Sequence, residues 1–202
     1  TLGPDERKIN TLSAALMYKT NQWDYDFQFL MGYSRENWVL GAGWAGNLGS
    51  ASLKGEMTYF YPVEETELDP KEFVGAISID HSIKNLYYNV SYLFNSAGPS
   101  ELGAEGLLLL NSRSLTAKNL SPYKHSTFLQ ASYQFHPLVS GGTGIMLFPP
   151  NKAIFLSPFV TWNVFQDFDL DFIVQAFYGE DFTSGSFRAL STSYFLRGKW
   201  SF

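Results

Sequence analysis

Apolar and polar residues alternate with a period of two along most of this chain. After Leu86, for example, Tyr88, Val90 and Tyr92 alternate with Asn89 and Ser91. The same pattern begins again at Trp23, Leu53, Ile154, Leu170 and Leu190. Successive side chains of a β-strand point to opposite faces, so the pattern predicts strands with one apolar and one polar face.

The alternating segments are long, at roughly 10 to 14 residues, whereas strands of soluble proteins usually have about 5 or 6. A strand that crosses a bilayer at a tilt needs about 9 to 11 residues. Eleven strands are predicted, at 8–20, 23–34, 37–47, 50–62, 72–83, 85–96, 124–136, 138–149, 152–165, 168–180 and 189–202. We therefore predict an all-β fold, a transmembrane antiparallel up-and-down β-barrel, with residues 1–202 as one domain. A soluble sandwich or lipocalin-like barrel is the alternative, and it needs shorter strands.

Composition agrees with this prediction through its aromatic residues. Hydrophobic residues make up 45% of the chain and the mean hydropathy is −0.11, values that a soluble protein also has. Aromatic residues, however, reach 17%, and amphipathic rings are favoured at membrane–water interfaces. No apolar stretch approaches the roughly 18 residues of a transmembrane helix.

Charge and cysteine content exclude several classes of function. The net charge of −5 argues against a nucleic-acid partner, because binding to phosphates needs a basic surface. Cysteine is absent, which removes disulfides, thiolate zinc sites and cysteine nucleophiles. We expect no cofactor and no metal.

The predicted connections alternate between tight turns and longer loops, except that two outer connections, 34–37 and 149–152, are also short. Tight turns are predicted at 20–23, 46–49, 83–86, 135–138 and 165–168, and longer loops at 63–71, 97–123 and 181–188. Short periplasmic turns facing longer outer loops are typical of outer-membrane barrels. The longest outer loop, 97–123, is predicted to hold a short helix within 100–118. Bacterial barrels normally have even strand numbers, so eleven strands indicate either a missing upstream barrel segment or a miscounted strand.

The polar faces supply candidate residues for the lining of a channel. They are Asp24, Asp26, Lys54, Glu56, Asp80, Asp169, Asp171, Arg197 and Lys199. Charges are costly on a lipid face, so the alternation places them in the lumen or at its rim. There they either select ions and small solutes or simply hydrate and brace the wall. The acidic excess in this set weakly favours cations.

Aromatic residues near the strand ends are predicted to anchor the barrel at the two lipid interfaces. The candidates are Tyr25, Trp38, Trp44, Tyr59, Tyr61, Tyr88, Trp162, Tyr178, Tyr194 and Trp200. In a soluble sandwich the same residues would be ordinary core.

Catalysis has little support in this sequence. Asp80 and Ser82 flank His81, but neighbouring strand residues point to opposite faces and cannot form a triad. His125 is expected at the outer end of a strand and His136 in a turn. No spacing of His or carboxylate residues predicts a metal site, and we predict that the protein is not an enzyme.

The last strand carries the most specific local signal. The chain ends Tyr194-Phe-Leu-Arg-Gly-Lys-Trp-Ser-Phe, and its alternating residues Tyr194, Leu196, Trp200 and Phe202 are aromatic or apolar. This segment resembles the terminal strand that the barrel-assembly machinery recognises in outer-membrane proteins. The resemblance implies that this machinery is a partner during biogenesis.

Most of the chain is similar to porin-like outer-membrane proteins of Gram-negative bacteria. The likeness rests on short segments, which begin at Trp38 (WVLGAGWAGNLG), Leu53 (LKGEMTYF), Leu86 (LYYNVSY), Tyr133 (YQFHPL), Leu156 (LSP) and Phe177 (FYGE). It implies a large barrel in the bacterial outer membrane, with the lipid bilayer as partner and passive transport as function. It supplies no catalytic residue.

The expected function is therefore passive diffusion of small hydrophilic solutes or ions. The alternative is a non-conducting structural or partner-binding barrel that is plugged by its long loop. A homo-oligomer is possible on either interpretation.

Overall fold

The computed structural model describes most of the predicted strand-forming sequence. It describes residues 13–65, 70–98, 118, 121, 123–149, 152–180 and 185–201. The predicted start of the first strand at 8–12, the predicted helix before residue 118, and Phe202 lie outside the described residues.

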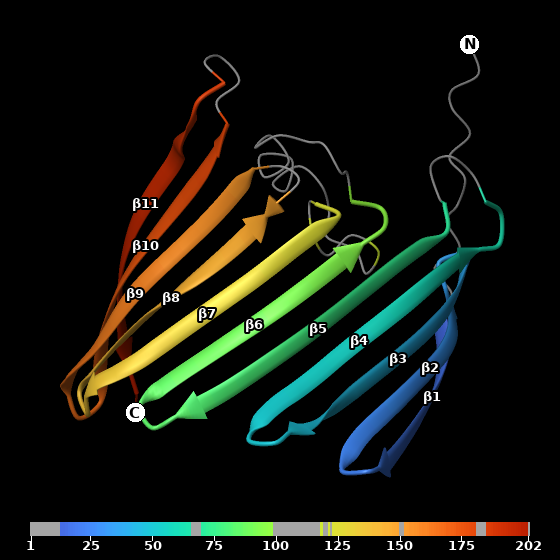
Figure 1. Ribbon diagram of the computed structural model, residues 1–202, viewed down its shortest axis with the longest axis horizontal. Coiled ribbons are helices and arrows are strands. Elements are labelled where there is room, and N and C mark those ends of the chain that lie inside the picture. The colour runs from blue at the N-terminus through green and yellow to red at the C-terminus, as the bar shows by residue number, and fades with distance from the viewer. Residues whose placement is uncertain are drawn as a thin grey trace.

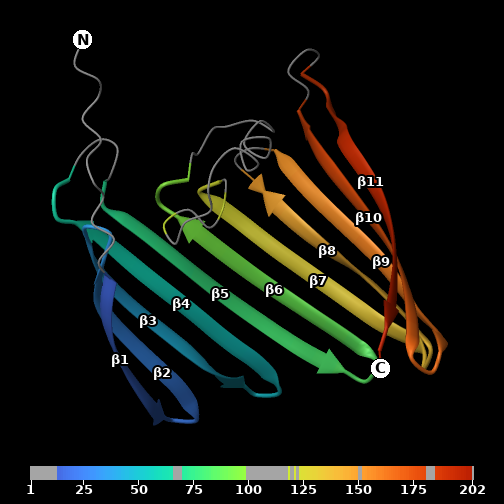
Figure 2. The same cartoon turned by 180° about the vertical axis from the view of Figure 1, so that it is seen from behind.

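Eleven antiparallel strands follow one another in a single sheet, in the order of the sequence (Figures 1 and 2). They are β1 (Ser13–Gln22), β2 (Tyr25–Ser34), β3 (Asn37–Leu48), β4 (Ala51–Pro62), β5 (Glu72–Ile83), β6 (Leu86–Asn95), β7 (His125–His136), β8 (Val139–Phe148), β9 (Ala153–Phe165), β10 (Phe168–Glu180) and β11 (Phe187–Trp200). The predicted all-β, up-and-down class is confirmed, and two strands have the predicted bounds. Among the described residues, no helix is long and apolar enough to cross a membrane.

The turns on one side of the sheet are tight. Trp23 and Asp24 join β1 to β2 with positive φ angles of 53° and 62°, the conformation of a two-residue type I′ hairpin turn. The turn was predicted at 20–23, but Asn21 instead continues β1 and pairs with Asp26. The turn after β3 is likewise displaced, because that strand continues to Leu48.

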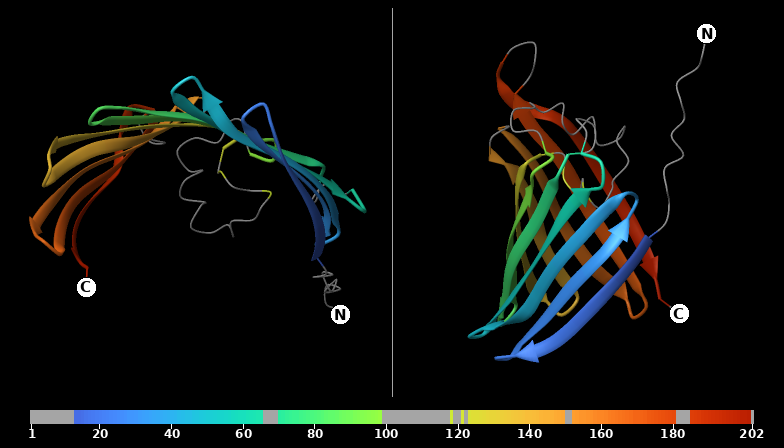
Figure 3. Two further views of the ribbon diagram at one scale, coloured as in Figure 1. Left: turned by 90° about the horizontal axis from the view of Figure 1, so that it is seen from below. Right: turned by 90° about the vertical axis from the view of Figure 1, so that its right-hand side faces the viewer.

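The sheet curves into a trough, and Figure 3 shows this most clearly in its end-on view. Strands β1 and β11 are the two edges, and within the described residues they do not pair with each other. Because every neighbouring pair is antiparallel, the first and the eleventh strand run in the same direction.

The pairing register divides the strand residues into a concave and a convex face. Directly paired residues share a face, so the row Asp26, Ala45, Lys54, Ser78 and Ser91 lies on one side of the sheet. This is the concave side, which also holds the hollow described below. Residues in between, such as Ile77, lie on the convex side.

The convex face is apolar and exposed. Leu40, Met57, Ile77, Val90 and Val160 belong to inner strands, yet each remains between 42% and 54% exposed. The buried apolar clusters lie instead on the concave face, where one contains Val39, Phe60 and Val74. The sheet thus shows its hydrophobic surface outward, the opposite of a soluble barrel.

Two aromatic rings lie over glycines of a neighbouring strand on the convex face. A Cβ atom on Gly55 would lie 2.2 Å from Trp44 Cζ2, and one on Gly46 would lie 2.4 Å from Tyr25 Cδ1. Glycine at these positions therefore leaves room for the ring across the strand.

We expect Gly55→Ala to lower the free energy of unfolding by about 1–3 kcal/mol, the usual cost of overpacking. The Trp44 ring must leave its place, so its fluorescence maximum should also shift. Urea unfolding in detergent micelles, followed by tryptophan fluorescence, measures both effects. Gly41→Ala is the matched control, because its new Cβ would meet nothing closer than 3.5 Å. Equal stability of the two variants would contradict this account.

Candidate functional site

The charged residues of the strands gather on the concave face. Within the eleven described strands, Glu180 at the end of β10 is the only charged residue on the convex face. The concave face carries the six acids Asp26, Glu56, Glu72, Asp80, Asp169 and Asp171 and the five bases Lys19, Lys54, Arg188, Arg197 and Lys199. The acidic excess seen in the predicted set is therefore nearly cancelled.

Eight of the nine predicted lining residues lie on this face. Asp24 is the exception, because it lies in the β1–β2 turn with a φ of 62°. The eight form two groups, one on β2, β4 and β5 and the other on β10 and β11.

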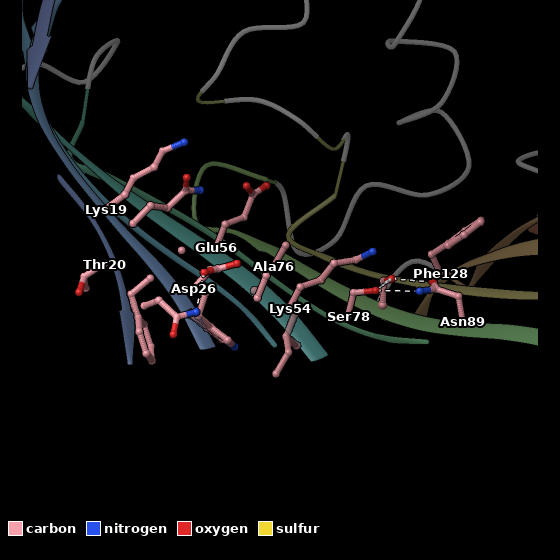
Figure 4. Close-up of a pocket in the computed structure, with 18 of the residues that line it drawn as sticks. Lys19, Thr20, Asp26, Lys54, Glu56, Ala76, Ser78, Asn89 and Phe128 are labelled. Carbon is pink, nitrogen blue, oxygen red and sulfur yellow. Dashed lines mark hydrogen bonds between the residues drawn. The ribbon is translucent and has the colours of Figure 1, made fainter. Parts of the chain in front are cut away.

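Three residues of the first group, Asp26, Lys54 and Glu56, line a hollow of about 990 Å³ on the concave face (Figure 4). Gly43, Ala45 and Ala76 contribute almost no side chain there, so the neighbouring strands enclose an open space. Lys19, Asp26, Lys54 and Glu56 line the hollow, together with uncharged polar residues of β5 to β7. Small residues between long charged ones explain why a curved sheet is hollowed at this place.

The four charged residues of the hollow differ in how they are paired. Asp26 accepts a hydrogen bond of 2.8 Å from Asn21 Nδ2. Lys54 Nζ lies 3.3 Å from Asp80 Oδ1, an ion-pair contact. For Lys19 and Glu56 no ion pair or side-chain hydrogen bond exists among the described residues. Both side chains can therefore form ion pairs and hydrogen bonds with a solute.

A hydrogen-bonded network of neutral side chains forms another wall of the hollow. Asn89 Nδ2 donates to Ser78 Oγ at 2.8 Å and Ser91 Oγ donates to Asn89 Oδ1 at 2.8 Å, while the Ser78 hydroxyl, 2.7 Å away, can donate to Ser91 Oγ. Figure 4 shows this cluster beside Phe128. The network fixes its own side chains and presents polar edges to the hollow.

Three residues of the second charged group, Asp169, Asp171 and Arg197, are held by hydrogen bonds or an ion pair. Asp171 is only 4% exposed and accepts hydrogen bonds from Thr161 Oγ1 at 2.7 Å and Arg197 Nε at 2.7 Å. Arg197 Nη2 lies 2.6 Å from the same carboxylate. Asn163 Nδ2 donates to Asp169 at 2.8 Å. These contacts join β9, β10 and β11, so Asp169, Asp171 and Arg197 brace the wall, whereas Lys199 is exposed.

The described end of the long loop also lies against the concave face. Tyr123 is fully buried and stacks at a tilt on Phe148, with 4.5 Å between ring centroids. Ser121 Oγ and Ser126 Oγ are 2.6 Å apart, and Asn95 Nδ2 donates to the Ser121 carbonyl at 3.4 Å. This group of residues, which we call the loop anchor, holds the loop to β6, β7 and β8. The rest of the predicted loop, apart from Ala97, Gly98 and Lys118, lies outside the described residues.

The ten predicted interface aromatics all lie on the convex face. Tyr25, Trp44, Tyr88, Trp162 and Trp200 lie toward the tight turns, and Trp38, Tyr59, Tyr61 and Tyr178 toward the longer loops. Tyr194 differs, because it pairs with Val174 in the middle of β10. Of the four residues of the predicted assembly signal, Leu196 joins Tyr194 and Trp200 on this face.

The histidines are not arranged for catalysis. His81 lies on the convex face of the sheet, whereas its neighbour Asp80 lies on the concave face. The Nδ1 atom of His81 is 2.7 Å from the Ser50 carbonyl oxygen. His125 Nδ1 is 2.6 Å from the Tyr92 hydroxyl, and His136 Nδ1 accepts a hydrogen bond from the Leu138 backbone. In the described part of the chain, no three His or carboxylate residues are grouped to hold a metal ion.

Sequence reasoning missed Lys19 and the neutral residues of the hollow. Lys19 is the only charged residue in β1, so its position on a polar face was a usable signal. The neutral residues had no such signal, because Ser, Asn and Gln are common on the polar face of any strand. Their grouping follows from the register across β4 to β7.

A solved outer-membrane protein has the same architecture. The chain is similar to the crystal structure of the outer membrane channel DcaP of Acinetobacter baumannii, with a TM-score of 0.55 and 10% sequence identity. The chain has the fold of an outer-membrane β-barrel. The match covers 94% of this chain and 62% of that chain, so this chain spans less than two thirds of the channel's length. No family model and no curated protein matches the sequence, and at this identity the likeness shows the fold alone.

Proposed function

We propose that this chain forms the wall of a porin-like outer-membrane channel for passive diffusion of small hydrophilic solutes. In this proposal the convex face contacts lipid and the concave face lines the aqueous lumen. The observation that carries it is the segregation of charge: in the eleven described strands, every charged residue except Glu180 lies on the concave face. A Lys or Arg on the lipid side costs about 2–4 kcal/mol near the bilayer midplane, which accounts for this segregation.

A membrane channel also needs partners for both edges of the sheet. Unpaired backbone N–H and C=O groups in hydrocarbon cost several kcal/mol each, so spanning sheets are closed. The proposal therefore includes further strands that pair with β1 and β11. The likeness to a longer outer-membrane channel supports this part of the proposal.

The test is single-channel conductance of the folded protein in a planar bilayer, with a salt gradient across it. We expect ohmic steps and a reversal potential close to zero that leans toward cations, because the concave face has six acids and five bases. Absence of conductance from protein that is shown to be folded and inserted would overturn the proposal of an open channel.

Because the chain contains no cysteine, single-cysteine variants can report which face is wet. Ala76→Cys lies on the floor of the hollow and Ile77→Cys on the convex face. A charged methanethiosulfonate reagent should lower the conductance of the first variant in discrete steps and leave the second unchanged. Block of the Ile77 variant alone would show that the faces are assigned the wrong way round.

A second candidate is a non-conducting structural or partner-binding barrel. The loop anchor favours it, because Tyr123 and Ser121 hold the end of the long connection against the concave face. This candidate predicts that conductance is absent in the wild type and is gained when the anchor is removed.

A further inference from the structure

Two charges of opposite sign that have no side-chain partner in the described part of the chain face the hollow from the two ends of one row of the sheet. The pairing register runs from Lys19 on β1 through Gln28 and Gly43 to Glu56 on β4. Strands lie about 4.8 Å apart, so the backbones that carry the two charges are separated by roughly 14 Å. Figure 4 shows Lys19 and Glu56 projecting from the sheet to the same side.

The next row carries a second pair of charges in the opposite order. Asp26 on β2 and Lys54 on β4 are separated by Ala45 on β3. Asn21 supports the carboxylate of Asp26, and Asp80 lies beside Lys54. The hollow therefore has two cations and two anions in its lining, with glycine and alanine between them.

This balance of charge determines which solutes bind favourably in the hollow. A solute with a single charge meets as much repulsion as attraction, because each row offers both signs. A solute with both charges can turn its anionic end to a lysine and its cationic end to a carboxylate. The neutral Ser78, Asn89 and Ser91 network adds polar edges but no further charge.

We infer that the hollow is a binding subsite for small zwitterions whose ammonium and carboxylate groups are several bonds apart. The ammonium group pairs with Glu56 and the carboxylate with Lys19, the two of the hollow's four charged residues that have no side-chain partner among the described residues. An extended chain advances about 3.3–3.6 Å per residue, so a dipeptide places its charged ends between the two side chains. The consequence for transport rests on the proposed channel, whereas binding does not.

The test uses four probes that share one backbone. Diglycine is the zwitterion, N-acetylglycine lacks its ammonium group, glycylglycinamide lacks its carboxylate, and N-acetylglycinamide lacks both charges. Permeation into liposomes that contain the folded protein is measured by osmotic swelling. Binding to the detergent-solubilised protein is measured by calorimetry. We expect diglycine to exceed each singly charged probe by about two- to fivefold in both, the size expected for one exposed ion pair.

Single substitutions then separate the two contacts. Glu56→Gln should remove the advantage of diglycine over N-acetylglycine, and Lys19→Gln its advantage over glycylglycinamide. Glu36→Gln and Lys84→Gln make the same changes of charge in turns and should leave all ratios unchanged.

The outcomes distinguish this inference from the proposed function. If N-acetylglycinamide does not permeate, the channel is wrong, and the binding data alone decide whether the hollow takes zwitterions. If the neutral probe permeates but the charged probes show no preference and no differential binding, the zwitterion subsite is overturned. An equal loss of binding and permeation for all four probes in the Glu56→Gln variant would also overturn it.

Discussion

Replacement of Arg197 by alanine is expected to lower the free energy of unfolding by about 1.5–3 kcal/mol, the contribution of hydrogen bonds to a charged group. The cause lies in Asp171, whose side chain is buried although Arg197 itself is 66% exposed. Without the guanidinium group, the carboxylate keeps only the hydrogen bond from Thr161. The variant thus loses the two contacts that the guanidinium group makes with the carboxylate.

Equilibrium unfolding in detergent or lipid vesicles measures this effect. Lys199→Ala is the matched control, because Lys199 lies two residues further along the same face of β11 and is exposed. We expect that control to change stability by no more than about 0.5 kcal/mol. The double variant Arg197→Ala with Asp171→Asn should recover part of the loss. If Lys199→Ala is as damaging as Arg197→Ala, the ion pair is not the cause.

Replacement of Tyr123 by alanine should detach the end of the long loop from the concave face. The ring is fully buried against Phe148 and Ala153, and loss of a buried aromatic side chain costs about 3–5 kcal/mol. Tyr123 packs on Phe148 and Ala153 at the ends of their strands, so we expect the cost in the loop anchor rather than in the whole sheet. Faster amide exchange at 121–126 and new protease cleavage near residue 121 are the expected results. Conductance should rise if the loop narrows the channel.

The loop anchor should also respond to alkaline pH. Burial raises the pKa of Tyr123 to about 12, from an ordinary value of 10.0. The folded anchor therefore favours the neutral phenol, and its stabilisation is complete below pH 10 and is lost as the pH rises through 12. Tyr123→Phe keeps the ring and removes the ionisable group, so its amide exchange should lose this pH dependence. An identical pH response in Tyr123→Phe would show that another group titrates.

Strand content followed almost directly from the two-residue alternation. Segments 72–83 and 168–180 coincide with β5 and β10, because a face that must remain apolar over a whole strand leaves a periodic signal. The β1–β2 turn was placed too early, since Asn21 and Gln22 look like turn residues but extend the strand. Trp23 and Asp24 have positive φ angles although neither is glycine, so no residue type marks the turn.

The sequence predicted which face of the sheet carries the candidate site, but not where on that face the site lies. Alternation assigned Asp26, Lys54 and Glu56 to a polar side but could not show that they surround one hollow. That grouping depends on the register across β1 to β4, which pairing between strands determines. The loop anchor was beyond prediction for the same reason, because Tyr123 finds Phe148 only after the sheet has formed.

The common direction of β1 and β11 restricts how copies of this chain could associate. Two copies inserted with the same orientation would bring these edge strands together as parallel strand pairs, whereas every strand pair within the sheet is antiparallel. Antiparallel pairs would need one copy inverted, with its long loops on the other side of the membrane. A cylinder with only antiparallel strand pairs therefore requires an odd number of additional strands between β11 and β1.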